Sequence, residues 1–158
     1  MNLKYQKMKK LVIYFALSFV FLFEAKAQTY EFKIVTSVES IVPGGIGRSR
    51  IIENGEEVDY TQFTTTRSKD VEEKTKKDRG DVKIDNLKES TLVNFYSMVG
   101  INFQNIASND AMTTSMLNLH SKDGWELIQI ASGVESDAGK DDGNGIFITR
   151  FYFKRAKK

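Results

Sequence analysis

The chain has no cysteine and a single histidine, His120. Without thiols it cannot form disulfides, a thiolate nucleophile, or a zinc or iron–sulfur site ligated by cysteine. One imidazole also excludes any site built from several histidines. We therefore expect a domain that is stabilised by its hydrophobic core rather than by covalent cross-links, and that has few kinds of chemistry open to it.

Long apolar runs are also scarce, and the longest extends only from residue 11 to residue 23. Four lysines precede it and Ala25-Lys26-Ala27 follows it, which is the layout of a secretory signal peptide cleaved before Gln28. Crossing a bilayer takes about 20 apolar residues, and a lipid anchor would need a cysteine. The sequence predicts a signal peptide over residues 1–27 and a periplasmic or secreted mature chain without a transmembrane span.

Basic residues are less dominant than the pI of 8.7 indicates. The leader carries five lysines and one glutamate, a net charge of +4, so subtracting it from the +2 of the whole chain leaves −2 for the mature part. A nucleic-acid-binding domain needs a basic surface, so we expect no nucleic-acid partner. The mature residues 28–158 suit a single globular domain.

Apolar and polar residues alternate over residues 29–39, which predicts a strand with one buried and one solvated face. A second extended run leads to Asn54-Gly55, the preferred centre of a two-residue hairpin turn. We expect its return strand between Val58 and Thr66. The segment 67–81 is almost wholly charged and can add little to a core, so it is interpreted as an exposed excursion, either a short helix capped by Asp70 or mobile chain.

The second half of the chain is more regular. The apolar segment from Leu87 to Val99, before Gly100, is compatible with a helix or with irregular packing. A helix is expected at about 109–123, with Ser108, Asn109 or Asp110 as its cap and Gly124 after its end. Its predicted apolar stripe is Met112, Met116 and Leu119. Strands are expected at 125–130 and 146–155, and Phe147, Phe151 and Phe153 share a face of the latter. The pattern predicts an α+β fold: a mostly antiparallel sheet of about five strands with one principal helix on one face.

Three segments resemble a family of small bacterial domains of unknown function, number 4177. They are the opening Tyr30-Glu31-Phe32-Lys33-Ile34-Val35, the later Lys122-Asp123-Gly124-Trp125-Glu126-Leu127-Ile128, and the closing Phe151-Tyr152-Phe153-Lys154-Arg155. The resemblance covers the first strand and roughly the last fifty residues, and residues 40–100 look like an elaboration. It implies a compact β-α-β-β arrangement and supplies no activity or catalytic residues.

Residues 30–40 also echo residues 125–136. If these two strands run parallel across the intervening helix, the loops 40–47 and 136–145 lie at the same end of the sheet, where binding residues tend to gather. The candidate binding rim consists of Arg48, Arg50, Asp141 and Asp142. Arginines in this Gly-rich setting could hold an anion, or could pair with the acidic residues of the other loop.

Hard oxygen ligands are grouped in the second loop, where Asp137, Asp141, Asp142 and Asn144 are candidates for calcium. Their spacing does not match an EF-hand, so an acidic loop without an ion is favoured, and we expect no metal or cofactor. His120 is expected at the boundary between core and solvent. Trp125 could stack a ligand, but a large aromatic residue after Gly124 is expected to pack against the helix.

No catalytic triad or carboxylate pair is recognisable, so no catalytic residue is predicted. The sequence favours an exported, non-enzymatic binding or interaction module of the cell envelope, whose partner is another envelope or secreted macromolecule. The first alternative is a small-ligand or calcium-binding protein that uses loops 40–47 and 136–145. The second is a hydrolase without a recognisable motif. The oligomeric state is left open.

Overall fold

The structure is a computed structural model that describes residue 8 and residues 28–42, 49–70, 72–73, 77–97, 99–135 and 145–157. The signal peptide predicted at 1–27 therefore lies outside the described residues, apart from Met8. The chain divides into two units, residues 1–30 with 156–158 and residues 31–155. Within the first unit, the Lys157 N–H donates to the Thr29 carbonyl at 2.9 Å. The fold that follows is that of the second unit.

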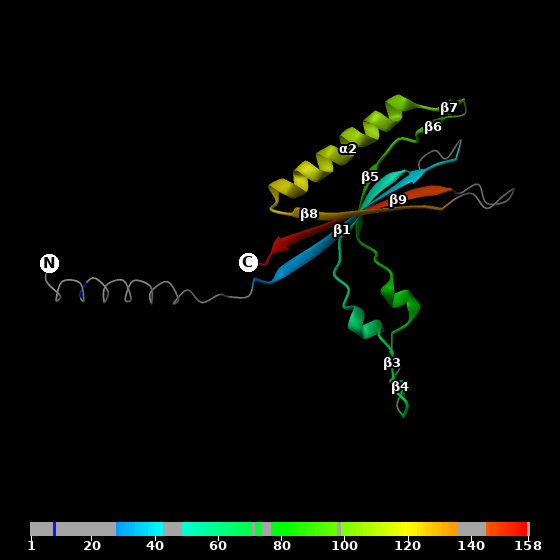
Figure 1. Ribbon diagram of the computed structural model, residues 1–158. Helices are drawn as coiled ribbons and strands as arrows, with labels where there is room; N and C mark the ends of the chain where they lie inside the picture. The colour runs from blue at the N-terminus through cyan, green and yellow to red at the C-terminus, as the bar shows by residue number, and fades with distance from the viewer. Residues whose placement is uncertain are drawn as a thin grey trace. The chain divides into compact units, whose positions relative to one another are not determined.

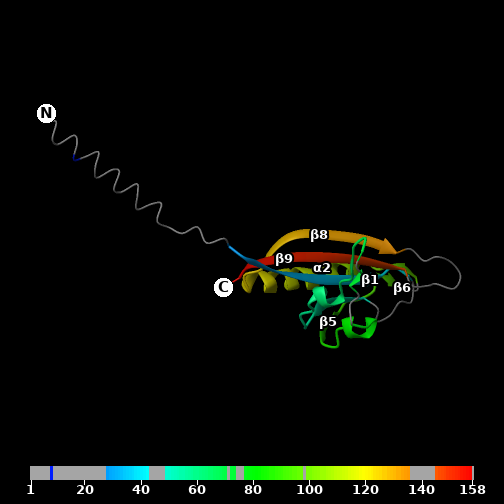
Figure 2. The same ribbon diagram turned by 90° about the horizontal axis from the view of Figure 1, so that it is seen from below.

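Five strands form one antiparallel sheet in the order β5-β2-β1-β9-β8, and a single long helix, α2, packs on one face of it (Figures 1 and 2). This α+β arrangement confirms the predicted fold class. The sheet and helix consist of β1 (Tyr30–Ser40), β2 (Arg50–Asn54), β5 (Leu87–Thr91), α2 (Phe103–Lys122), β8 (Glu126–Glu135) and β9 (Ile146–Ala156).

β1 and β8 lie on either side of β9 and run parallel to each other, because each is antiparallel to β9. The backbone N–H of Ile41, directly after β1, donates to the carbonyl of Gly145, directly before β9, at 3.0 Å. The segments that follow β1 and β8 therefore start at the same end of the sheet. The loops themselves, residues 43–48 and 136–144, lie outside the described residues.

The face of β1 under α2 is the less apolar of its two faces. Val35 and Ser37 are 0% and 4% exposed there, and Glu39 on the same face accepts a hydrogen bond from Asn109 of α2 at 2.8 Å. Phe32 and Ile34 alternate with them and are 69% and 44% exposed. The alternation identified the strand, but the larger apolar side chains are not the buried ones.

α2 begins six residues before the predicted start of about 109. Asn102 is the N-cap, since its side-chain oxygen accepts from the backbone N–H groups of Gln104 and Asn105 at 3.0 and 3.3 Å. The predicted caps were wrong, because Ser108 lies within the helix and bonds the Gln104 carbonyl. The predicted end is confirmed: Gly124 follows the C-cap with a φ of +82°, a conformation that glycine adopts without strain.

The core lies between α2 and the sheet and is dominated by aromatic and branched side chains. Its apolar members are Val35, Ile51, Leu92, Met116, Trp125, Phe151 and Phe153, all of them buried. Of the stripe predicted for α2, only Met116 belongs to it, since Met112 and Leu119 are 43% and 57% exposed. The buried face of the helix is instead marked by Asn109, Met116 and His120.

The hairpin predicted at Asn54-Gly55 was wrong. β2 pairs with β5, so Asn54 lies opposite Leu87, and the Gly55 N–H donates to the Asn86 carbonyl at 2.8 Å. The expected type I′ turn needs positive φ at both central residues, and among the described glycines only Gly100 and Gly124 have positive φ. Gly55 is required for a different reason: a Cβ there would lie 2.7 Å from the Asn86 carbonyl oxygen.

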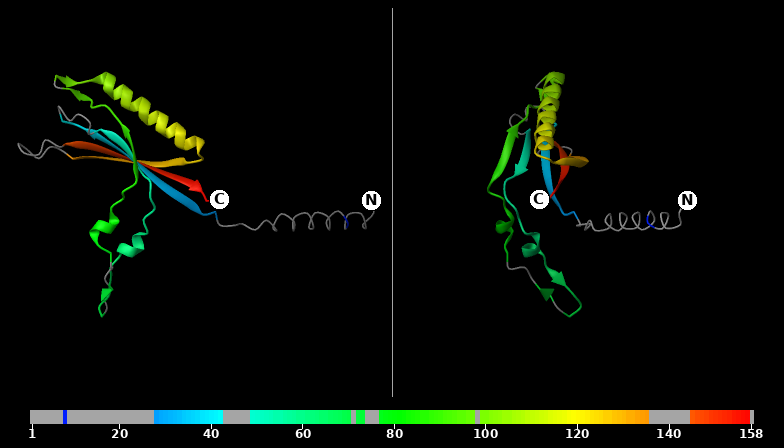
Figure 3. Two further views of the ribbon diagram at one scale, coloured as in Figure 1. Left: turned by 180° about the vertical axis from the view of Figure 1, so that it is seen from behind. Right: turned by 90° about the vertical axis from the view of Figure 1, so that its left-hand side faces the viewer.

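The excursion, defined here as residues 55–86, leaves the sheet between β2 and β5 (Figures 1 and 3). It holds two 3₁₀ helices and a two-residue strand pair: η1 (Tyr60–Phe63), β3 (Thr66–Arg67), β4 (Glu72–Glu73) and η2 (Arg79–Val82). The return strand expected at 58–66 and the short helix considered at 67–81 were therefore wrong. Residues 67–70, 77, 78 and 80–83 are exposed, as a charged segment requires.

Asn109 fastens α2 to the segment that follows β5. Its side-chain oxygen accepts the Val93 N–H at 2.9 Å, and its amide donates to the Val93 carbonyl at 2.7 Å. Beyond Val93, the region that was left open between helix and irregular packing contains β6 (Tyr96–Ser97) and β7 (Gly100–Ile101), a second short pair. A single buried amide thus satisfies both backbone groups of a residue outside regular structure.

Candidate functional site

His120 lies inside the fold rather than at its boundary. It is 3% exposed between α2 and the sheet, and its ring centroid is 5.0 Å from that of Phe153. Its Nε2 is 3.5 Å from Oε1 of Glu53, and the other carboxylate oxygen of Glu53, Oε2, is 3.7 Å from the Lys33 ammonium. Among the described residues, neither ring nitrogen has a hydrogen-bond partner. This buried imidazole is not placed to exchange protons with a substrate on the surface.

Burial lowers the pKa of His120 below its ordinary value of 6.5, because a charged imidazole is poorly solvated there. The carboxylates of Glu53 and Asp123 oppose the shift, and the Lys33 ammonium reinforces it. The folded state consequently holds His120 neutral at a pH where the unfolded chain begins to protonate it. The imidazole is therefore expected to make the stability of the fold depend on pH.

We expect the free energy of unfolding to fall as the pH drops below about 6.5, because the unfolded state then binds more protons than the folded state. The loss continues down to the lowered pKa of folded His120 and stops below it. Urea titrations between about pH 7.5 and pH 5 should show this slope, and His120→Gln should flatten it. Parallel profiles for the two proteins would contradict the assignment to His120.

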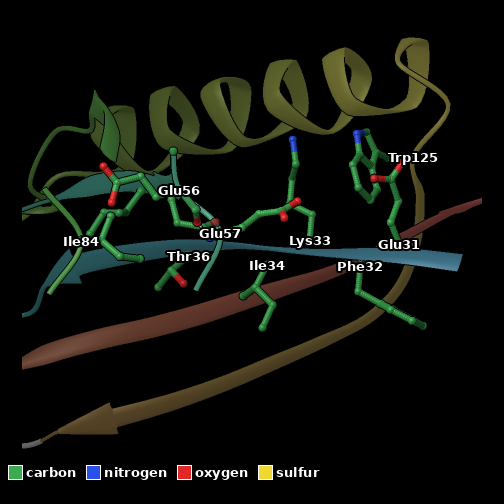
Figure 4. A pocket seen from close by; sticks show the side chains of 12 residues that line it. Glu31, Phe32, Lys33, Ile34, Thr36, Glu56, Glu57, Ile84 and Trp125 are labelled. Atoms are coloured by element: carbon green, nitrogen blue, oxygen red, sulfur yellow. Dashed lines mark hydrogen bonds between the residues drawn. The ribbon is translucent and has the colours of Figure 1, made fainter. Parts of the chain in front are cut away.

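A groove with a volume of about 650 Å³ lies beside the N-terminal half of β1. Figure 4 shows Glu31 and Lys33 pointing toward α2 and Trp125, while Phe32 and Ile34 point to the other side of the strand. The excursion supplies the remaining wall, including Glu56, Glu57 and Ile84. This groove, called the β1 groove below, is lined by side chains from both faces of β1. It is an open groove along the strand and not an enclosed cavity.

Trp125 is buried at the end of this groove, with 8% of its surface exposed. The Lys33 ammonium lies 4.9 Å and the Arg155 guanidinium carbon 4.3 Å from its ring centroid. Arg155 is held in turn by Glu31 at 2.7 Å and by the Asp123 carbonyl at 3.1 Å. Cation–π contacts already occupy the ring, so Trp125 packs in the core, as expected, and is not a stacking platform for a ligand.

β8 is the most accessible long strand, since all ten of its residues are exposed. Within the described part of the chain it is the last strand of the sheet, with β9 as its one partner. Leu127, Ile128, Ile130 and Val134 are 37–63% exposed along it. Such a long apolar edge offers unpaired backbone groups and hydrophobic side chains together, and natural proteins usually protect it.

A hollow borders β8 on each side. The one next to α2 measures about 340 Å³ and is lined by Leu117, Asn118, Leu127 and Phe153, among others. The other measures about 300 Å³ and lies where the small side chains of Ala131–Gly133 leave Ile148 uncovered. Side chains of an added strand would point alternately to these two sides. β8 and its two hollows are together called the β8 edge below.

The opposite edge strand is protected. β5 has only five residues, and Lys88 and Glu89 stand among them. Arg50 of β2 donates to both carboxylate oxygens of Glu89 at 2.9 Å, an exposed ion pair that contributes little to stability. Charged side chains and short length are common means of preventing strand addition. The two edges of the sheet therefore differ in what they can accept.

The predicted binding rim is only partly described. Arg50 is placed on β2 and pairs with Glu89. Arg48, Asp141 and Asp142 lie outside the described residues, as do the other calcium candidates Asp137 and Asn144. Among the residues that are described, no group of three or more His, Asp or Glu side chains is arranged to hold a metal ion.

None of the helices within the described ranges is both long and apolar enough to cross a bilayer.

The β8 edge and the β1 groove were not predicted from the sequence. The only available signal for the β8 edge was the run Glu126–Glu135, which contains no lysine, arginine or proline.

Comparison with protein-family models, with curated proteins and with solved structures found no match. The resemblance to family 4177 therefore stays a prediction.

Proposed function

We propose that the protein is an exported, non-enzymatic binding module of the cell envelope that captures an extended segment of a partner protein along the β8 edge. The observation that carries this proposal is the ten-residue exposed edge strand with apolar side chains. In strand addition, backbone hydrogen bonds supply affinity and pockets for alternate side chains supply specificity. The leader and the lack of a catalytic constellation support export and a binding role.

The partner segment should carry two apolar side chains about seven residues apart and on opposite faces, because one hollow lies at Trp125–Leu127 and the other at Ala131–Glu135. Glu126 and Glu135 stand at the two ends of β8. Basic residues flanking the partner segment would face these carboxylates and set its register. Surface charge of this kind favours the correct partner and the rate of association more than it raises affinity.

A photoreactive residue in place of Ile128, introduced in the full-length chain in its producing cells, is expected to cross-link to one discrete envelope protein. The double variant Ile130→Lys/Val134→Lys should lower that adduct by at least about tenfold, because charged side chains oppose the apolar partner. Both residues are more than half exposed, at 52% and 63%, so the fold should tolerate the change.

The matched control is Val58→Lys/Val82→Lys in the excursion, where the two valines are 43% and 46% exposed. This variant adds the same charge and should keep the adduct. A cross-linker at Val82 should not give the same product. Equal adducts from positions 82 and 128, or an adduct that survives the β8 substitutions, would reject the β8 edge as the binding surface.

A further inference from the structure

A second strand edge is open on β1, in the interior of the sheet order. β2 pairs with β1 only from Val35 to Val38, and the chain then turns into the excursion at Gly55. Among the described residues, the half of β1 from Glu31 to Ile34 therefore has a strand neighbour only on its β9 side. Its other side faces the β1 groove. This position is independent of the β8 edge.

The exposure of Phe32 is unusual for a large apolar residue within a strand. Its side chain is 69% exposed, and Figure 4 shows it projecting from the side of β1 that faces away from α2. Glu31 and Lys33 flank it and project to the side of α2. This half of β1, which has no strand on its groove side among the described residues, thus presents an acid, an aromatic residue and a base in order. The two charged side chains lie on one face and the ring on the other.

This order is complementary to itself. When two such segments pair antiparallel with Phe32 opposite Phe32, Glu31 lies opposite Lys33 of the second copy, and Lys33 lies opposite its Glu31. Opposite charges and aromatic pairs directly across a strand pair are favourable. The same pairing obeys the twofold symmetry of an isologous dimer, in which each contact occurs twice.

We propose that the β1 groove is occupied by a second copy of this chain, joined by antiparallel pairing of the two β1 segments about a twofold axis at Phe32. The β8 edge is less suited to self-association. With two β8 strands in full antiparallel overlap, Glu126 would lie opposite Glu135 at both ends, and like charges directly across a strand pair are unfavourable. The charge pattern therefore assigns self-association to β1 and leaves the β8 edge for a different partner.

Cysteine substitution tests the register directly, because the chain has no cysteine of its own. In the protein produced from the full-length sequence, Phe32→Cys places the two thiols across the axis, within the reach of a disulfide. Ile34→Cys is the matched control, since its two copies would be about 14 Å apart along the strands. Oxidation is expected to give a disulfide-linked dimer with Phe32→Cys and not with Ile34→Cys.

Sedimentation equilibrium gives the second measurement. The unsubstituted protein should be a dimer, and Phe32→Glu should raise its dissociation constant at least tenfold, because two carboxylates then face each other at the axis. Ile130→Glu, which changes the β8 edge, should leave the dimer intact. A monomeric unsubstituted protein, or equal cross-linking by the two cysteine variants, would overturn the proposal. Loss of the dimer through Ile130→Glu alone would also overturn it, whatever the outcome of partner capture at β8.

Discussion

Replacing Phe153 with alanine is expected to lower the free energy of unfolding by about 3–5 kcal/mol. The side chain is 1% exposed, projects from β9 and contacts the ring of His120 on α2. It belongs to the same core cluster as Trp125 and Met116. The substitution loses the favourable free energy of transferring the ring from water to the core. It also leaves a cavity that the closely packed neighbouring side chains cannot readily fill. Urea titration followed by Trp125 fluorescence would measure the loss.

Phe103→Ala is the matched control for this substitution. Phe103 is the first residue of α2 and is 77% exposed, so the same chemical change there should alter stability by no more than about 0.5 kcal/mol. If the two variants lost similar amounts of stability, the core would not lie between α2 and β9. A large difference would locate it there without reference to any ligand.

Asn109→Ala is expected to lower the free energy of unfolding by about 2–4 kcal/mol, because it removes three hydrogen bonds made by a side chain that is itself 4% exposed. The amide of Asn109 bonds both backbone groups of Val93 and the carboxylate of Glu39. Val93 and Glu39 are partly accessible to water, so each of the three lost bonds is expected to cost about 0.5–1.5 kcal/mol. Thermal and urea denaturation would both report this change.

Asn118→Ala provides the comparison on the same helix. Asn118 is exposed, and substituting alanine there should be neutral or slightly stabilising, since alanine has the higher helix propensity. Equal effects at positions 109 and 118 would contradict the role assigned to the buried amide. Hydrogen exchange at the Val93 amide should accelerate in the Asn109 variant alone, because only that variant loses the acceptor.

The fold class could be predicted because its main signals are local. Alternation marked β1, apolar residues at 125–130 and 146–155 marked β8 and β9, and Gly124 marked the end of α2. These strands and the helix account for the α+β sheet with one covering layer. The start of α2 could not be predicted as easily, because Asn109 resembles a cap in sequence but acts as a buried bridge.

Pairing between distant segments was the main failure. Asn54-Gly55 carries a strong local turn signal, yet β2 pairs with β5 across the whole excursion. The identity of a strand's partner depends on the rest of the sheet, and a dipeptide does not encode it. The buried face of α2 was missed for a related reason: it contains Asn109 and His120, and helical periodicity identifies only apolar residues.

The candidate sites were less predictable than the fold. The two segments expected to share an end of the sheet do begin there, as the bond from Ile41 to Gly145 shows. Whether a strand lies at an edge, however, follows from topology and not from its own residues. The sequence of β8 is compatible with a central strand, and only the order of the sheet exposes it. Likewise, the unpaired half of β1 exists because β2 is short.

The hydrogen bond between Gly55 and Asn86 affects how the sequence of this chain can evolve. This hydrogen bond holds the two ends of the excursion next to each other. The sheet therefore connects to the excursion through the same two residues, whatever sequence lies between them. Doubling the length of a flexible connection adds only about 0.6 kcal/mol to the entropy of closing it. The excursion can therefore lengthen, shorten or be replaced while the rest of the domain stays constant, which makes it a site where new sequence can be acquired without refolding the scaffold.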